Sequence, residues 1–122
     1  MPVELQWHAS LPVLMATYRG TLSAKDYEKM CDERLKMLRN GPDQVVFVAD
    51  TRDLLAFADA EAAARRESIF LHEKIVHTLL ILQEDVYHRL VRSFMNDAST
   101  PYPVSFATDI DQALVELKGI LS

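Results

Sequence analysis

Two largely apolar runs limit the folds open to this chain more than any other feature of the sequence. They are Val45–Ala49, which is rich in β-branched residues, and Val76–Leu82. A strand with one face in water alternates apolar and polar residues, whereas a continuous apolar run is typical of a strand covered on both faces. We therefore predict that these two runs are parallel neighbours in a sheet lying between layers of helices.

Three further strands are expected. Residues 3–7 alternate apolar and polar, and residues 13–18 form a second short run that Gly20 closes. The short connection between them favours an antiparallel hairpin, because a parallel crossover needs a dozen or more residues. A last, short strand is expected at residues 104–107.

Helices are predicted between these strands from their capping residues and apolar spacing. Ser23, with Asp26 three residues later, should begin the first helix, and Gly41 should end it in a left-handed conformation. The other helices are expected at 59–73, at 84–95 and from Thr108 or Asp109 to 121. A chain of 122 residues normally forms one domain.

The predicted order is β-β-α-β-α-β-α-β-α. It indicates an α/β sandwich filling residues 1–122, with a mixed, mostly parallel sheet of about five strands and helices on both faces. The first strand should be antiparallel to the others and should lie at an edge.

The charge and the absence of signals exclude several classes of function. The net charge is −5, and no run of basic residues is longer than Arg65-Arg66, so nucleic acid is not an expected partner. We see no run long enough for a membrane span and no secretory signal. The single Cys31 allows no internal disulfide, which fits a reducing compartment. We expect a cytoplasmic protein.

Four acidic residues are the first candidates for a site, and they are Asp50, Asp53, Asp59 and Glu61. Asp50 should follow a central strand and Asp59 should begin a helix. Ligands of open α/β sheets often bind at this edge, and paired carboxylates can hold Mg²⁺ or act as acid and base. Capping and loop solvation explain the same residues without any ligand.

Thr51 and Arg52 lie beside that cluster. Arg52 has the geometry to grip a phosphate or a carboxylate with two hydrogen bonds, unless Asp53 occupies it in a local pair. An ordinary polar turn is the simpler interpretation.

Motifs of catalysis and metal binding are missing from the sequence. The four histidines form no pair with metal-ligand spacing, and Cys31 lies on the apolar face of a predicted helix. Three glycines are too few for a phosphate-binding loop. We expect no metal, no cofactor and no catalytic residue.

The segment 54–58 is apolar although it lies in a predicted loop. It can fold back as core, line an apolar pocket with Phe70 and Leu71, or form a dimer patch.

Three stretches carry a resemblance to a known family. They are residues 18–23, in which a glycine is followed by a capped helix, residues 45–50, a buried strand before an aspartate, and residues 104–114, a short strand leading into an acidic-capped helix. Their order resembles the STAS (sulfate-transporter and anti-sigma-factor-antagonist) domain family, and in particular its small bacterial members. In that family a serine at the start of the second helix is the phosphorylation switch. The matching stretch has Asp59, but Ala60 carries no hydroxyl, and Glu61 can act as a fixed negative charge or simply suit the helix dipole.

The resemblance implies a non-enzymatic regulatory or binding module that contacts a partner protein or a small ligand near residues 50–61. The residues expected to carry this contact are Asp50, Thr51, Arg52, Asp53, Phe57, Asp59 and Glu61. Homodimerisation is expected separately, through the apolar loop and the second helix. The alternative is a small carrier of an apolar, lipid-like ligand in a pocket near Phe57 and Phe70.

Overall fold

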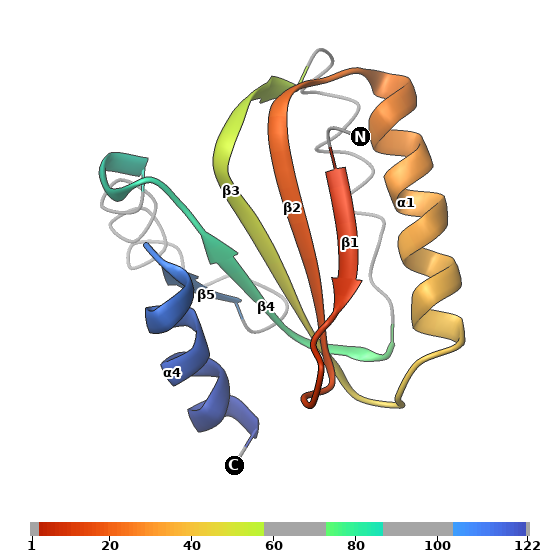
Figure 1. Ribbon diagram of the computed structural model, residues 1–122. Helices are drawn as coiled ribbons and strands as arrows, with labels where there is room; N and C mark the ends of the chain where they lie inside the picture. Colours follow the sequence, from red (N-terminus) through yellow and green to blue (C-terminus); the bar gives the residue numbers. More distant parts are fainter. Residues whose placement is uncertain (1–2, 58–72, 87–103, 122) are drawn as a thin grey trace.

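The computed structural model describes residues 3–57, 73–86 and 104–121 (Figure 1). Its elements are β1 (Val3–Trp7), β2 (Val13–Leu22), α1 (Ala24–Arg39), β3 (Val45–Phe57), β4 (Ile75–Ile81), β5 (Val104–Ala107) and α4 (Ile110–Leu121). Residues 84–86 are also helical. The helix predicted at 59–73 and most of the one predicted at 84–95 lie outside the described residues.

The strands form one mixed sheet in the order β1-β2-β3-β4-β5. β1 is antiparallel to β2, and each of the other neighbouring pairs is parallel. The two apolar runs are therefore central parallel neighbours, with Phe47 opposite Thr78 and Asp50 opposite Ile81. The predicted fold class is confirmed, including the antiparallel first strand at the edge.

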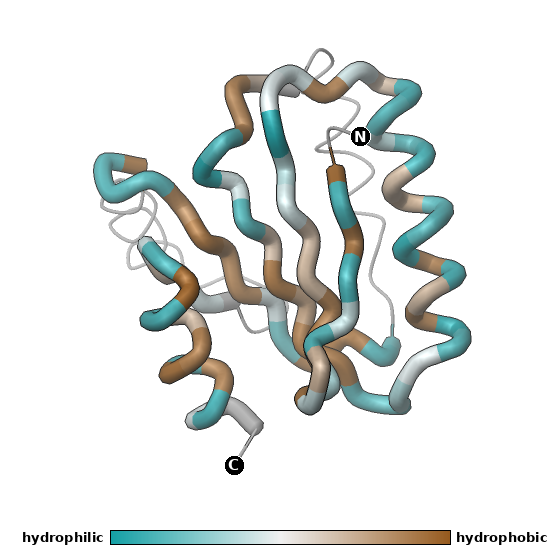
Figure 2. Tube along the Cα trace, in the orientation of Figure 1, coloured by the Kyte–Doolittle hydropathy of each residue, from teal (hydrophilic) through white to brown (hydrophobic). Residues whose placement is uncertain are grey.

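Alternation along the strands sends apolar side chains to both faces of the sheet. Leu14, Ala16 and Phe47 point to the face that α1 covers, whereas Val46, Val48 and Leu79 point to the face that α4 covers. The two helices lie on opposite sides of the sheet in Figure 1, and the lower halves of the central strands are largely hydrophobic in Figure 2. Each helix therefore closes a separate core.

The first helix begins as its capping residues predict. Ser23 Oγ accepts a hydrogen bond from the backbone N–H of Asp26, and the Asp26 carboxylate accepts one from the N–H of Ser23. At the other end, Lys74 Nζ donates to the carbonyls of Leu38 at 2.9 Å and Gly41 at 3.3 Å. This ammonium group satisfies carbonyls that the last turn of a helix leaves without partners, and it complements the helix dipole.

The inner face of α1 includes a charged residue that the apolar spacing did not indicate. Arg34 is 1% exposed, its Nη2 donates to Cys31 Sγ at 3.7 Å, and its guanidinium lies 5.1 Å from the centre of the Phe47 ring. A guanidinium is weakly hydrated and stacks on aromatic faces, so it can be buried against a ring at lower cost than an ammonium group.

The conformation predicted for Gly41 is wrong. Among the described residues, Gly20 has a positive φ of 67° and no other residue does. Gly41 is required for space: a Cβ at this position would lie 2.6 Å from the Trp7 ring and 3.1 Å from the Met37 carbonyl oxygen. The sequence around Gly41 correctly indicates the end of the helix. It does not indicate the contact with Trp7, because Trp7 belongs to β1, far from Gly41 in the chain.

We predict that Gly41→Ala destabilises the protein by about 1–3 kcal/mol, because Trp7 would have to leave its position over the helix end. The matched control is Gly119→Ala on α4, where a Cβ meets no atom within 4 Å. This change should stabilise the protein by about 0.5–1 kcal/mol, since alanine favours a helix interior. Urea denaturation measures both effects, and an equal response of the two variants would contradict the packing argument.

A histidine joins β4 to β5 on the face that α4 covers. His77 Nε2 and Ser105 Oγ lie 2.7 Å apart in a partly buried hydrogen bond. Burial lowers the pKa of His77 below its ordinary value of 6.5, and the negative charge of Glu116 offsets this only in part. The folded protein therefore favours the neutral imidazole.

A dependence of stability on pH follows from this lowered pKa. As the pH falls below 6.5, His77 takes up a proton in the unfolded chain before it does so in the folded protein, so acidification through this range destabilises the fold. We expect His77→Gln to remove this part of the loss, which urea denaturation between about pH 8 and pH 5 would measure. Parallel losses of stability in the variant and the unmodified protein would show that His77 is not responsible.

Candidate functional site

The candidate site lies where β3 continues beyond its predicted end. The predicted end of this strand at Asp50 and the loop expected at 51–58 are wrong over residues 51–57, because β3 continues to Phe57. Residue 58 lies outside the described residues. β2 is also longer than predicted and pairs with β3 as far as Leu22 opposite Phe57. Gly20, which we expected to close β2, instead allows the strand to continue with a left-handed residue.

Two bulges shape this extension of β3. Thr17 lies opposite Asp50 but Arg19 opposite Asp53, so β3 contains one more residue than β2 between these pairs. The extra residue reverses the alternation, and Leu54 therefore packs against the core under α1 instead of the core under α4.

The second bulge exposes an apolar side chain. Gly20 lies opposite Leu54 and Thr21 opposite Ala56, which leaves Leu55 as the extra residue without a partner on β2. Its side chain is 80% exposed. The apolar segment 54–58 thus divides within the described residues, because Leu54 contributes to the core and Leu55 projects into solvent.

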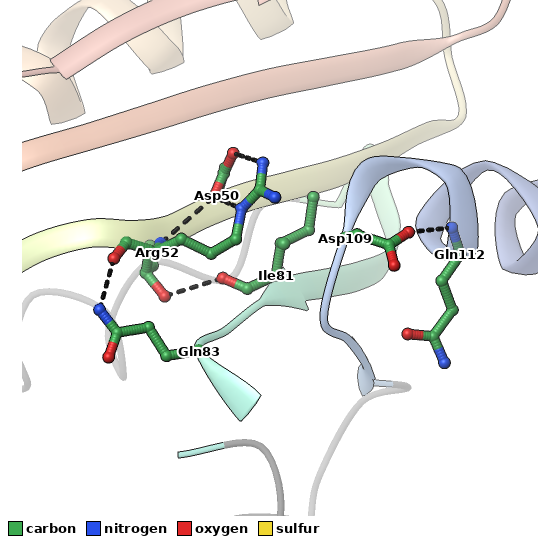
Figure 3. A network of polar contacts seen from close by, with 7 residues as sticks. Asp50, Arg52, Ile81, Gln83, Asp109 and Gln112 are labelled. Carbon is green, nitrogen blue, oxygen red and sulfur yellow. Dashed lines mark hydrogen bonds and ion pairs between the residues drawn. The ribbon is translucent and has the colours of Figure 1, made fainter. Parts of the chain in front are cut away.

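Asp50 and Arg52 form a two-point ion pair at the first bulge (Figure 3). Arg52 Nε donates to Asp50 Oδ1 at 3.0 Å and Nη2 donates to Oδ2 at 2.9 Å, while the backbone N–H of Arg52 also donates to Oδ1 at 3.2 Å. Side-chain exposure is 13% for Asp50 and 35% for Arg52. The local partner of Arg52 is therefore Asp50 and not Asp53, and the grip of Arg52 on a phosphate or carboxylate of a ligand stays a prediction.

The electrostatics hold both groups in their charged forms. Burial acts to raise the pKa of Asp50, but the side-chain and backbone hydrogen bonds from Arg52, with the charges of Arg52 and Arg19, outweigh it and lower this pKa below 3.8. The hydrogen bond to Asp50 raises the pKa of Arg52, against the opposing effect of burial, and Asp53 and Asp109 add to the rise.

Neighbouring strands fix the backbone on which this pair is built. Thr51 Oγ1 donates to the carbonyl of Ile81 at 2.9 Å, and Gln83 Nε2 donates to the carbonyl of Arg52 at 2.8 Å. Asp109 lies nearby at the start of α4, where its Oδ1 accepts from the N–H of Gln112 at 2.7 Å and confirms the predicted cap (Figure 3). The carboxyl ends of β4 and β5 therefore lie beside residues 50–52 of β3, where the pairing of β3 with β4 stops.

This arrangement suits recognition better than acid–base chemistry. A carboxylate with a lowered pKa is a weak general base near neutral pH, and both of its oxygens are already engaged by Arg52. Within residues 3–57, 73–86 and 104–121, no three His, Cys, Asp or Glu side chains are placed to hold a metal ion. In the same ranges, no helix is both long enough and apolar enough to cross a membrane.

The structure brings together part of the predicted site. Asp50 and Arg52 bind each other, and Thr51 between them donates to the Ile81 carbonyl of β4. Asp53 follows as an exposed residue, opposite Arg19. Phe57 is the last residue of β3. Asp59 and Glu61 lie outside the described residues, as do Phe70 and Leu71, so the carrier hypothesis stays a prediction.

Sequence reasoning missed two residues of the site. Leu55 was seen only as part of an apolar segment, and the bulge that exposes it depends on pairing with β2. Gln83 directly follows the apolar run of β4, as Asp50 follows that of β3. Ligands often bind beyond the carboxyl ends of parallel strands, so this position was a signal from which Gln83 could have been predicted.

We predict that Asp50→Asn destabilises the protein by about 1 kcal/mol near neutral pH, because the amide cannot accept both charge-assisted hydrogen bonds. Since the folded pKa of Asp50 is below 3.8, the carboxylate stabilises the fold above that value and loses this effect as the pH falls through the lowered pKa. The two proteins should therefore converge in acid. Urea denaturation from about pH 7 to pH 2 measures this, with Asp53→Asn as the exposed control; a constant difference at all pH values would contradict it.

Comparison with known proteins supports the fold. No protein-family model and no curated protein matches the chain. A solved structure of an uncharacterised protein of the DUF3478 family from Shewanella loihica PV-4, described as having a SpoIIAA-like fold, superimposes with a TM-score of 0.69 at 20% identity, over 94% of this chain and 91% of that one. The SpoIIAA-like fold is the STAS-like fold, so the chain has the fold that its sequence resemblance predicts.

Proposed function

We propose that this protein is a non-enzymatic regulatory module that binds a partner protein through the surface formed by Asp50, Arg52, Asp53 and Leu55, here termed the β3 surface. The observation that carries the proposal is the 80% exposure of Leu55 on the same extension of β3 that holds the Asp50–Arg52 ion pair. An exposed apolar side chain rimmed by charged groups is the usual composition of a small protein-binding surface.

The β3 surface is organised before any partner arrives. Arg52 is held by Asp50, and the backbone at Thr51 and Arg52 is held by hydrogen bonds to β4 and Gln83. Binding to a surface of this kind loses little conformational entropy, which favours affinity from a small contact area. Charged groups of both signs around Leu55 would supply specificity.

Control of binding by phosphorylation at the family's position does not fit the sequence, because Ala60 stands where a serine would be needed. Regulation would then depend on the concentrations of this protein and its partner. The proposal places the protein in the cytoplasm and allows a second copy of the chain as the partner.

Site-specific photo-crosslinking in the source organism tests the proposal. Benzoylphenylalanine at position 55 should give a discrete adduct of higher mass. The same residue at position 115 is the matched control, because Val115 is 73% exposed and belongs to α4, a different element. The yield at position 55 should fall several-fold when Asp53→Lys is added.

Equal adduct patterns at positions 55 and 115, or no adduct at position 55, would refute a binding role of the β3 surface. Adducts at position 55 that are unaffected by Asp53→Lys would refute the part assigned to charge. Mass spectrometry of the adduct identifies the partner and distinguishes a second copy from another protein.

A further inference from the structure

We propose that the end of β3 binds an extended peptide segment of the partner by strand addition. This rests on the proposed function and states how the partner is held. Pairing between β3 and β4 ends at Asp50 opposite Ile81, whereas pairing between β2 and β3 continues to Leu22 opposite Phe57. β2 and β3 continue together beyond the point where β4 turns away (Figure 1).

Residues 51–57 therefore have a strand neighbour on one side only within the described residues. A strand edge presents backbone N–H and C=O groups that can pair with another chain. The carbonyl of Arg52, just past the end of the pairing with β4, accepts a hydrogen bond from the side chain of Gln83 at 2.8 Å. At Arg52, the Gln83 side chain supplies the hydrogen bond that a neighbouring strand would otherwise make. Beyond it, β4 does not pair with residues 53–57.

The side chains along this edge indicate the chemistry of the peptide. Leu55 and Ala56 are exposed apolar residues, and Asp53 is an exposed carboxylate. Two more exposed carboxylates, Glu84 and Asp85, lie in the segment that leaves the end of β4. Arg52 is already paired with Asp50, so charge complementarity to the exposed carboxylates favours a peptide in which apolar residues alternate with lysine or arginine.

The bulges of β3 limit how far such pairing can extend. Bulged edges twist away from the plane of the sheet and are one of the ways in which proteins avoid open-ended association. With bulges on both sides of Asp53 and Leu54, this edge suits a short peptide and not a growing sheet.

Fluorescence anisotropy with the full chain tests the proposal. The probe is a labelled short peptide of alternating valine and lysine. One matched probe has alternate amide nitrogens methylated, which removes the donors that a strand needs, and another has glutamate for lysine. We expect each matched probe to bind at least about tenfold more weakly, equivalent to about 1.4 kcal/mol.

Protein variants locate the binding to β3. Leu55→Asp should weaken binding of the valine–lysine probe, and Asp53→Lys should reverse the preference in favour of the glutamate probe. Val115→Asp on α4 is the exposed control and should leave binding unchanged. In hydrogen–deuterium exchange, the amides of residues 53–57 should become slower to exchange when the probe is added.

Equal binding of the methylated probe would overturn strand addition, as would no binding of any probe. Amides at 53–57 that are already protected without the probe would overturn it too, since the edge would then be covered by the chain itself. If crosslinking from position 55 still succeeds in these cases, the β3 surface remains a binding site and only the strand-addition mode fails.

Discussion

The burial of β3 between two parallel neighbours is the constraint on which the rest of this structure depends. Five consecutive buried residues, Val45–Ala49, send side chains alternately into the core under α1 and the core under α4. Both cores therefore depend on one strand, and slippage of its register by one residue would exchange the two sets of side chains. β2 and β4 pair directly with this strand, and β5 pairs with β4.

The site is a consequence of how this constraint ends. Past Asp50, β4 turns away, and β3 keeps only β2 as a neighbour within the described residues. The strand there tolerates extra residues, because no second ladder of hydrogen bonds has to be kept in register. The bulges that result place Arg52 against Asp50 and leave Leu55 in solvent. Bulges commonly redirect side chains beside functional sites. Here the first bulge redirects a charged residue, Arg52, and the second an apolar residue, Leu55.

Much of the fold could be predicted because its signals are local. The apolar runs, the capping box at Ser23 and the short hairpin before β2 each act within a few residues, and the structure agrees with all of them. The end of β3 could not be predicted in the same way. The local sequence predicts a polar turn at residues 51–53. These residues nevertheless remain in the strand, because β2 continues beside them. The buried Arg34 was missed for a similar reason, since its burial depends on the Phe47 ring from another element.

The sequence by itself determined the class of the fold, the direction of the central strands and the carboxyl edge at which charged residues gather, because the spacing of apolar residues dictates which faces must be buried. Only the tertiary structure decided which carboxylate Arg52 binds, that Gly41 makes room for Trp7, and that Leu55 is exposed while Leu54 is part of the core. These outcomes depend on register and contact between residues distant in the chain, which the local spacing of residues does not encode.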